Sequence, residues 1–237
     1  MIKIPLILCH ILYGFLYSLY ILYISEKPKK KFIRSWSKKL LKILKINLIV
    51  NPNIEKILSE NNYLIVSNHI SWLDIFLINS IYPVTFLSKA SVSKWPLIGP
   101  LTKSANTIYI DRKRMSAIKI TKNKIEFYLN HIGSVYFFPE GTATDGSYIL
   151  PFKSNFFQTA INSKVNILPI TIKYSYQKKF TSAPSYFGDM SLLQSTFNLI
   201  KLDNIEANLN ISPQIKSTSD RKELARKAYD AIDKFLD

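Results

Sequence analysis

The chain has 237 residues and a formal net charge of +16, and it is long enough for one sizeable α/β domain with a small appendage. Of its 32 basic residues, 27 are lysines and 5 are arginines. This balance disfavours specific nucleic-acid recognition, which relies on the planar fork of arginine, whereas an anionic membrane surface requires only positive charge. The single cysteine, Cys9, excludes an internal disulfide and a cysteine metal site.

Residues 2–24 form an apolar run that contains one charged residue, Lys3. As a helix this run would reach roughly 34 Å, which is enough to cross the hydrocarbon core of a bilayer. Residues 27–45 then contain nine basic residues and no acidic one. By the positive-inside rule, the rest of the chain is expected on the cytoplasmic face of the membrane. A helix that enters one leaflet without crossing it is equally compatible with this pattern.

Within residues 27–45, apolar residues recur at helical spacing among the lysines. They are Phe32, Ile33, Trp36, Leu40, Ile43 and Leu44. This pattern predicts a basic amphipathic helix lying in the membrane interface. The alternative is a helix packed against the domain with a basic, solvated outer face. We therefore expect membrane-anchoring helices at 1–46 and a separate domain at 47–237.

After the anchor, apolar runs typical of strands alternate with runs typical of helices, which predicts an α/β domain. Strands are expected at 63–67, 84–87, 107–110, 135–138, 167–174 and 205–211. Helices are expected at 73–80, 116–131, 155–162 and 220–236, the last capped by Ser219. Because the strand runs are solidly apolar rather than alternating, we expect a mixed, mostly covered sheet flanked by helices.

The first candidate for catalysis is His69, two residues beyond the predicted strand at 63–67, with Asp74 five positions later. Such a pair often occurs by chance. On a continuous helix the two side chains would lie about 140° apart, so they can meet only if His69 precedes the helix and Asp74 lies in its first turns. Asp74 would then fix the imidazole tautomer while the other ring nitrogen takes a proton from a hydroxyl. No serine, cysteine or lysine stands out as a nucleophile, so the substrate's own hydroxyl is expected to attack.

Two further loops follow predicted strands. Residues 138–142 contain Glu140, Gly141 and Thr142, which form either an ordinary tight turn or a site in which Glu140 binds a hydroxyl or a backbone donor. Arg112 follows the strand at 107–110. It makes either a surface ion pair that contributes little to stability or a clamp for a phosphate. Pro169, inside an apolar run, indicates an edge strand or a bulge.

Taken together, four blocks resemble, in order, the 1-acylglycerol-3-phosphate acyltransferase family and its relatives. The blocks lie at 68–74, 106–112, 138–142 and 167–170, so the resemblance covers roughly residues 63–174. It identifies residues 47–237 as an acyltransferase domain. It implies acyl transfer from acyl-CoA or acyl carrier protein to the free hydroxyl of a lysophospholipid, without a metal or cofactor. An apolar tunnel for the acyl chain, lined partly by aromatic residues, is expected beside His69.

The resemblance also implies roles for individual residues. His69 would be the general base and Asp74 would orient it. Arg112 would bind the phosphate of the acceptor. The acceptor site would be lined by Glu140, Gly141 and Thr142.

The chain departs from the family pattern at three positions. Asn106 and Asn155 stand where glycine is usual, and Ala143 stands where an arginine is common. Asparagine tolerates positive φ, so the turn at Asn106 can survive. The missing arginine leaves the acceptor open. Lysophosphatidic acid, held by Arg112 and Lys153 and converted to phosphatidic acid, is expected first.

The alternatives are another lyso-lipid, such as a lyso-ornithine lipid, or a non-catalytic basic membrane-binding protein. Some relatives that act on lyso-ornithine lipid carry a Thr-x-x-Asp-Gly ending like residues 142–146. The intact His69 and Asp74 pair argues against a non-catalytic protein. The expected partners are thus membrane lipids, the lyso-lipid and the acyl donor, and no nucleic acid.

Overall fold

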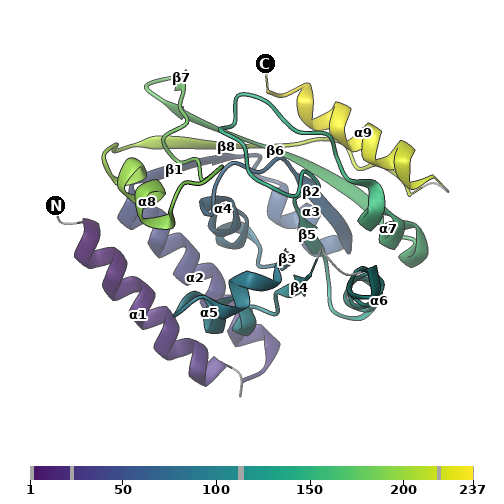
Figure 1. Cartoon of the computed structure of the whole chain (residues 1–237), viewed down its shortest axis with the longest axis horizontal. Coiled ribbons are helices and arrows are strands. Elements are labelled where there is room, and N and C mark those ends of the chain that lie inside the picture. Colours follow the sequence, from purple (N-terminus) through teal and green to yellow (C-terminus); the bar gives the residue numbers. More distant parts are fainter. Residues whose placement is uncertain (1–2, 22–23, 112–114, 218–219, 237) are drawn as a thin grey trace.

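The computed structural model describes residues 3–21, 24–111, 115–217 and 220–236. Within these residues, strands form one eight-stranded sheet in the order β1-β8-β6-β2-β5-β3-β4, with β7 paired to β6 (Figure 1). The strands are β1 (Ile46–Val50), β2 (Tyr63–Ser67), β3 (Thr85–Lys89), β4 (Ile108–Ile110), β5 (Val135–Phe137), β6 (Asn166–Tyr176), β7 (Lys179–Phe180) and β8 (Ile205–Ile211). The helices are α1 (Lys3–Ile21), α2 (Glu26–Leu44), α3 (Ile54–Glu60), α4 (Leu73–Ile81), α5 (Ile98–Ser104), α6 (Met115–His131), α7 (Phe157–Ser163), α8 (Leu192–Ile200) and α9 (Arg221–Asp233), with short 3-10 turns at Ala90–Lys94 and Ser154–Phe156.

The sheet is mixed, as expected. β6, β2, β5, β3 and β4 are parallel to one another in turn, whereas β8 is antiparallel to β6 and parallel to β1. The predicted strands at 63–67 and 205–211 coincide with β2 and β8, and the other four differ by at most two residues at either end. The elements β1, β7, α3, α5 and α8 were not predicted. The expected cap Ser219 lies outside the described residues, and Asp220 caps α9 instead, its side chain accepting from the amide of Lys222.

Helices cover both faces of the sheet, which explains why β2 is apolar at every position. Tyr63 and Ile65 pack into a core shared with α2, α3 and α4, and Leu64 and Val66 pack into a second core shared with α6, α7 and α9. All five residues of β2 are buried. Figure 1 shows the same two layers of helices on opposite sides of the strands. The expectation of a covered sheet is confirmed.

The two N-terminal helices pack against the domain and against each other. The apolar side of α2, including Leu40, Leu41 and Leu44, is buried, and α2 packs along α4. The alternative of a helix packed on the domain therefore describes α2, because protein covers this part of its apolar side. Along α1, one side is buried against α2 and α5, and the other side is exposed. The expected boundary between residues 46 and 47 falls within β1.

Pro169 lies in the interior of the sheet, because β6 pairs with β2 on one side and with β8 on the other. The edge-strand interpretation is therefore wrong. The β8 ladder ends at the pair Ile170 and Ile211, and pairing resumes at Ile167 and Ile215. Between these two pairs, residues 212–214 lie opposite residues 168 and 169 of β6, and this extra residue makes a bulge. Pro169, which has no N–H to donate, lies in this bulge. The bulge interpretation of this proline is confirmed.

Candidate active site

His69 lies directly beyond the carboxyl end of β2, and Asp74 is the second residue of α4. The residues between them turn the chain so that Nδ1 of His69 lies 2.9 Å from Oδ2 of Asp74. His69 thus precedes the helix and Asp74 lies in its first turn, which is the arrangement the spacing required. The structure brings the two side chains together. Their catalytic roles stay predictions.

Asp74 is fully buried and accepts hydrogen bonds from several elements. Its Oδ2 accepts from the amides of Ile70 and Ser71 at 2.9 Å as well as facing His69. Its Oδ1 accepts from the Tyr174 hydroxyl, at 2.8 Å, from the end of β6. A buried carboxylate is tolerated only when such donors replace its water. Burial and the nearby Asp74 charge raise the pKa of Tyr174 well above its usual value, so Tyr174 stays protonated and remains a donor.

These contacts determine the tautomer of His69. Backbone amides only donate, so the Oδ2 corner of Asp74 is an acceptor, and Nδ1 of His69 must carry a hydrogen. In the neutral ring Nε2 then holds the lone pair. The imidazole stacks on Phe138, with the ring centroids 3.8 Å apart and the planes 15° apart. The His69 side chain is 22% exposed, so Nε2 belongs to a ring that a substrate can reach.

Glu140 joins the loop after β5 to the loop that carries His69. Its Oε1 accepts from the backbone amide of His69 and its Oε2 accepts from that of Leu150, both at 2.7 Å. Burial raises the pKa of Glu140 to about 7, although the two amide donors favour its charged form. Of the two interpretations of residues 138–142, the structure favours the one in which Glu140 binds backbone donors. Glu140 thereby holds the main chain of His69.

Other contacts support the same loop from both sides. The side chain of Asn68 donates to the carbonyl of Ile172 at 2.9 Å and accepts from its amide at 2.8 Å, so it continues the pairing between β2 and β6 by one step. The amide of Thr144 donates to the carbonyl of His69 at 2.9 Å. Gly146 has φ +91°, and a Cβ there would lie 2.9 Å from Cδ1 of Ile70. The segment at 143–146, which lacks the family's arginine, therefore packs directly against the loop that carries His69.

The remaining predicted site residues have different outcomes. Arg112 lies outside the described residues. Gly141 has φ +81°, and its amide donates to the carbonyl of Phe138 at 3.1 Å, so glycine is needed at this turn. Thr142 and Lys153 are exposed, and the backbone of Lys153 is tied to the same turn by donating to the carbonyl of Pro139 at 3.0 Å. Their contact with a substrate stays a prediction, as does the apolar tunnel.

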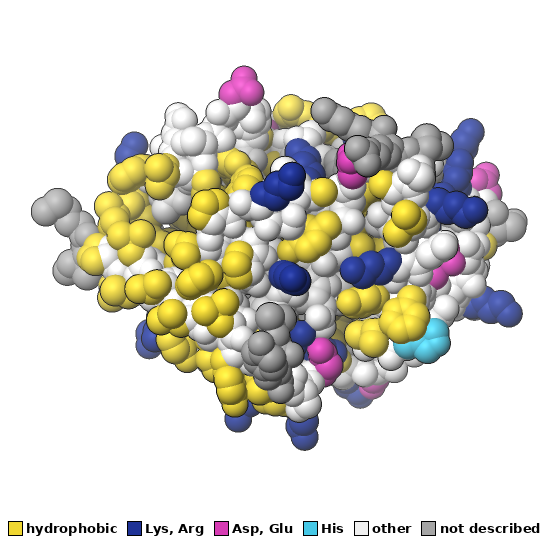
Figure 2. All heavy atoms as spheres, turned by 60° about the horizontal axis from the view of Figure 1, so that its bottom comes forward, with side chains coloured by type: hydrophobic (Ala, Val, Ile, Leu, Met, Phe, Trp, Pro, Cys, Tyr) yellow, Lys and Arg dark blue, Asp and Glu magenta, His cyan; other side chains and the backbone are white. Residues whose placement is uncertain are grey.

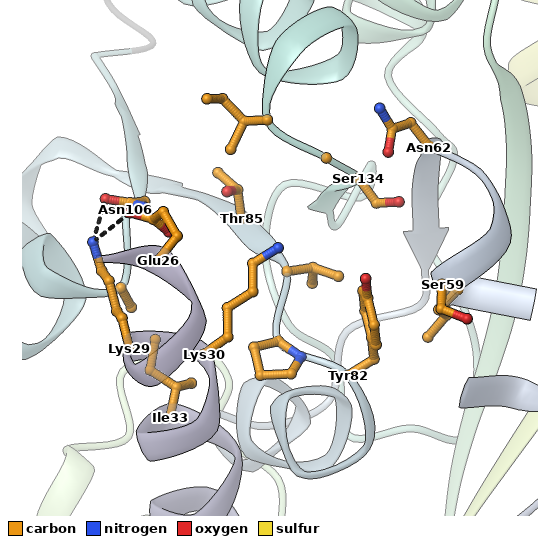
Figure 3. A pocket seen from close by; sticks show the side chains of 16 residues that line it. Glu26, Lys29, Lys30, Ile33, Ser59, Asn62, Tyr82, Thr85, Asn106 and Ser134 are labelled. Atoms are coloured by element: carbon orange, nitrogen blue, oxygen red, sulfur yellow. Dashed lines mark hydrogen bonds and ion pairs between the residues drawn. The ribbon is translucent and has the colours of Figure 1, made fainter. Parts of the chain in front are cut away.

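A polar hollow of about 80 Å³ lies at the opposite edge of the sheet (Figure 3). It is lined by the amino ends of the strands, including Asn62, Thr85 and Ser134, and Lys30 points into it. Asn106 borders it with φ +57°, so asparagine replaces the usual glycine as expected, and its side chain accepts from Nζ of Lys29 at 2.9 Å. Neither His69 nor Asp74 lines this hollow. It is distinct from the candidate active site.

Sequence reasoning missed Tyr174, Phe138 and Asn68 as parts of the site. Phe138 and Asn68 stood inside recognised blocks but carried no assigned role. Tyr174 is 100 residues from Asp74 along the chain, and its only sequence signal was its place at the end of an apolar run. No group of three or more histidine, cysteine, aspartate or glutamate residues that could hold a metal ion occurs in the part of the chain that the structure describes.

With this geometry in view, comparison with known proteins identifies the family. The acyltransferase family model matches residues 49–173, more than half of the chain. The chain belongs to this acyltransferase family. The match includes all four blocks and ends at the residue before Tyr174.

The curated relatives include two kinds of lyso-lipid acyltransferase. A 1-acyl-sn-glycerol-3-phosphate acyltransferase from Neisseria gonorrhoeae is 32% identical over 146 residues, which are 61% of this chain and 57% of the relative. A lyso-ornithine lipid O-acyltransferase from Pseudomonas aeruginosa is 32% identical over 168 residues, which are 70% of this chain and 65% of the relative. The alignment thus spans little more than half the length of the Neisseria protein.

The fold is also that of a solved acyltransferase. The 1-acyl-sn-glycerophosphate (LPA) acyltransferase PlsC from Thermotoga maritima superposes with a TM-score of 0.67 over 97% of this chain and 94% of that one. The two sequences are 19% identical, so this likeness shows the fold alone.

Proposed function

We propose that this member of the acyltransferase family moves a fatty acyl group from acyl-CoA or acyl carrier protein to the free hydroxyl of a lyso-lipid, with His69 as general base. The observation that carries the proposal is the buried Asp74, whose donors from the β2–α4 loop and from β6 leave Nδ1 of His69 protonated and Nε2 ready to accept a proton. A positioned imidazole of this kind suits deprotonation of an alcohol. No metal ion or prosthetic group is needed for these steps.

His69 can both accept and return the proton that moves during acyl transfer. Nε2 of His69 takes the hydroxyl proton of the lyso-lipid as its oxygen attacks the thioester carbonyl carbon. The C–S bond then breaks, and the departing thiolate takes the proton back from the imidazolium. The negative charge of Asp74 stabilises the transient imidazolium, while Glu140 and Phe138 hold the backbone and the ring in place. The products are an ester and a free thiol.

The acceptor we propose first is 1-acylglycerol-3-phosphate, which would give phosphatidic acid. Arg112 and Lys153 would bind its phosphate, and Gly141 and Thr142 would line its path. A second candidate is a lyso-ornithine lipid. One observation favours it: residues 143–146 carry no cation, and Thr144 instead bonds the carbonyl of His69.

A direct assay tests both proposals. The protein, purified in detergent, is given labelled acyl-CoA or acyl carrier protein and a panel of lyso-lipids with and without a phosphate monoester. We expect turnover that His69→Ala abolishes and that His131→Ala leaves intact, because His131 is exposed at the end of α6. Turnover confined to acceptors without the phosphate monoester would replace the first candidate by the second. An unchanged rate for His69→Ala would end the proposed mechanism.

The phosphate contacts have their own test. Arg112→Ala is expected to raise KM for 1-acylglycerol-3-phosphate by about tenfold or more with little change in kcat, because it removes a charge-assisted contact rather than a reacting group. Lys56→Ala, at an exposed lysine on α3, is the matched control. An unchanged acceptor dependence for Arg112→Ala would remove it from the site.

We further propose that α1 anchors the chain to the cytoplasmic face of the membrane and lies within one leaflet. The described residues include one helix that is long and apolar enough to cross a bilayer, α1. Its amino end is tied to the domain, however, because Nζ of Lys3 donates to the carbonyl of Leu202 at 2.9 Å and pairs with Asp203. A helix that crossed the bilayer would carry Lys3 roughly 30 Å away. Tags at the two termini should thus be digested from the same side of sealed vesicles, and protection of only one tag would contradict the proposal.

A further inference from the structure

The short helix α8 presents an unusual surface. It contains no charged residue, and Ser191 caps its start by accepting from the amide of Gln194 at 3.1 Å. Leu193 and Phe197, one turn apart, are 72% and 49% exposed, whereas Ser195 on the inner side is completely buried. Single exposed apolar residues are ordinary on soluble proteins. Leu199 is buried on the inner side as well, so α8 carries large apolar residues on both its inner and its outer side. Two large exposed ones on successive turns of an uncharged helix depart from the polar outer side of an ordinary surface helix.

The end of α8 lies beside the start of α1. Nζ of Lys3, at the start of α1, lies 3.4 Å from the carbonyl of Ile200, the last residue of α8. The exposed apolar residues of α1 are Ile4, Leu6, Leu8, Leu12, Tyr13, Leu16, Leu19 and Tyr20. Figure 2 shows hydrophobic side chains gathered on the side of the molecule where Figure 1 places both helices. We call these residues, together with Leu193 and Phe197, the apolar platform.

From this platform we infer that α8 is a second membrane contact, which enters the same leaflet as α1 and holds the candidate active site at the bilayer surface. Contiguous exposed apolar patches of this kind mark interaction sites. The rim of the platform is basic: Lys201 directly follows α8 and is exposed, and Nζ of Lys39 lies 5.8 Å from the ring centroid of Tyr13 on α1. An apolar centre with a lysine rim fits a leaflet that contains anionic lipid. The acidic residues at the two ends of α8 are Asp189, before its start, and Asp203, beyond its end, and Asp203 is paired with Lys3 and Lys45.

The platform is connected to the base by hydrogen bonds. Trp72, which lies between His69 and Asp74 in sequence, donates from Nε1 to Oγ of Ser195 at 3.2 Å. The same Oγ donates to the carbonyl of Ser185 at 2.9 Å. The amide of the next residue, Tyr186, donates to the carbonyl of Ile70 at 2.8 Å. The helix that we place in the leaflet is thus attached to the loop that positions the imidazole.

This attachment has a consequence for substrate access. A lyso-lipid reaches the enzyme with its acyl chain in the leaflet and its free hydroxyl near the headgroups. A loop fixed to α8 keeps His69 at that depth. The inference rests on the proposed function only for this last step, because membrane contact by α8 is a property of the surface alone.

Depth-dependent fluorescence tests the contact without any catalysis. In a Cys9→Ser background, Leu193→Cys is labelled with an environment-sensitive dye and the full chain is reconstituted in vesicles containing anionic phospholipid. We expect a blue shift and quenching by doxyl groups on the lipid acyl chains. Lys227→Cys on α9, where Lys227 pairs with Glu223, carries the same dye as the control and should remain unquenched. Equal quenching of the two labels would overturn the inference. A blue shift that appears in detergent and grows with protein concentration would also overturn it, since a second copy of the chain would then cover α8.

A kinetic comparison tests the consequence for access. Leu193→Ser with Phe197→Ser should raise KM for a vesicle-embedded acceptor by about tenfold, since burial of one large apolar side chain corresponds to at least that factor in an equilibrium constant. Turnover of a short-chain, water-soluble acceptor should be unchanged. If both acceptors are affected equally, α8 acts on folding rather than on membrane access. If neither the native chain nor the variant turns over any acceptor while the label at 193 is quenched, the proposed function fails and the membrane contact stands.

Discussion

A carboxylate can help a catalytic histidine in two ways, by fixing its tautomer and orientation and by stabilising its positive charge. Asp74→Asn separates these two effects, because the surroundings of Asp74 dictate how an amide must lie. The Oδ2 corner faces Nδ1 of His69 and the amides of Ile70 and Ser71, so the amide oxygen of asparagine must occupy it. The nitrogen then replaces Oδ1 and faces Tyr174, whose hydroxyl rotates from donor to acceptor. The asparagine variant therefore keeps the tautomer and orientation of His69 and loses only the negative charge.

The magnitude follows from that single lost charge. At about 4 Å and an effective dielectric constant of about 20, a unit charge stabilises the transient imidazolium by roughly 4 kcal/mol. Part of this is recovered by the amide dipole, so we expect kcat/KM to fall by about a hundredfold to a thousandfold. His69→Ala removes the base altogether and should fall further. The melting temperature of Asp74→Asn should fall, because the second amide hydrogen of asparagine and the hydroxyl hydrogen of Tyr174 lose the acceptor that Oδ1 provided.

The assay is initial-rate kinetics in detergent micelles with a water-soluble acceptor, run beside thermal unfolding of each variant. Tyr174→Phe on both backgrounds completes a double-mutant cycle. In the asparagine background, Tyr174→Phe leaves a buried amide nitrogen without a hydrogen-bond partner and should lower the free energy of unfolding by about 1–3 kcal/mol. A rate for Asp74→Asn within about threefold of the native rate would refute the electrostatic role. A rate as low as that of His69→Ala, from a variant that is still folded at the assay temperature, would refute the retained tautomer.

Three further predictions concern the groups around the base. Burial raises the pKa of Glu140 to about 7. Between about pH 4.5 and 7 the folded chain therefore keeps a proton that the unfolded chain releases. The free energy of unfolding should fall by up to about 3 kcal/mol as the pH rises through this range. Glu140→Gln should remove that dependence in denaturant titrations at several pH values, and an identical slope in both proteins would contradict the assignment. Asn68→Ala leaves the amide and carbonyl of Ile172 without their side-chain partner and should cost about 2–4 kcal/mol by urea unfolding, with Asn210→Ala on β8 as the control. Gly146→Ala places a methyl group against Ile70 at positive φ and should lower the melting temperature and kcat together, whereas Gly188→Ala, at positive φ with open space around it, should lower only the former.

The sequence alone was sufficient for the elements whose patterns are local. The solid apolar run at 63–67 matched a strand residue for residue, since a strand covered on both faces has no polar alternative. The run at 205–211 also matched, and there apolar residues alternate with Glu206, Asn208 and Asn210. His69 and Asp74 were found because a helix start between them was visible in the sequence. The edge strand β1 was missed: its burial alternates along five residues next to a longer helix, so its pattern merges with that of α2.

What the tertiary structure decided is which side chains meet across long stretches of chain. Tyr174 reaches Asp74 only because β6 lies beside β2, and Glu140 binds the amide of His69 only because β5 lies on the other side of β2. Neither order of strands is written in a local pattern, because many pairings satisfy the same apolar runs. The amphipathic helix α2 likewise showed in sequence that it has an apolar side, but only the packing on α4 showed that protein rather than lipid covers that side. Burial free energy is much the same against either partner, so the composition of one helix cannot distinguish them.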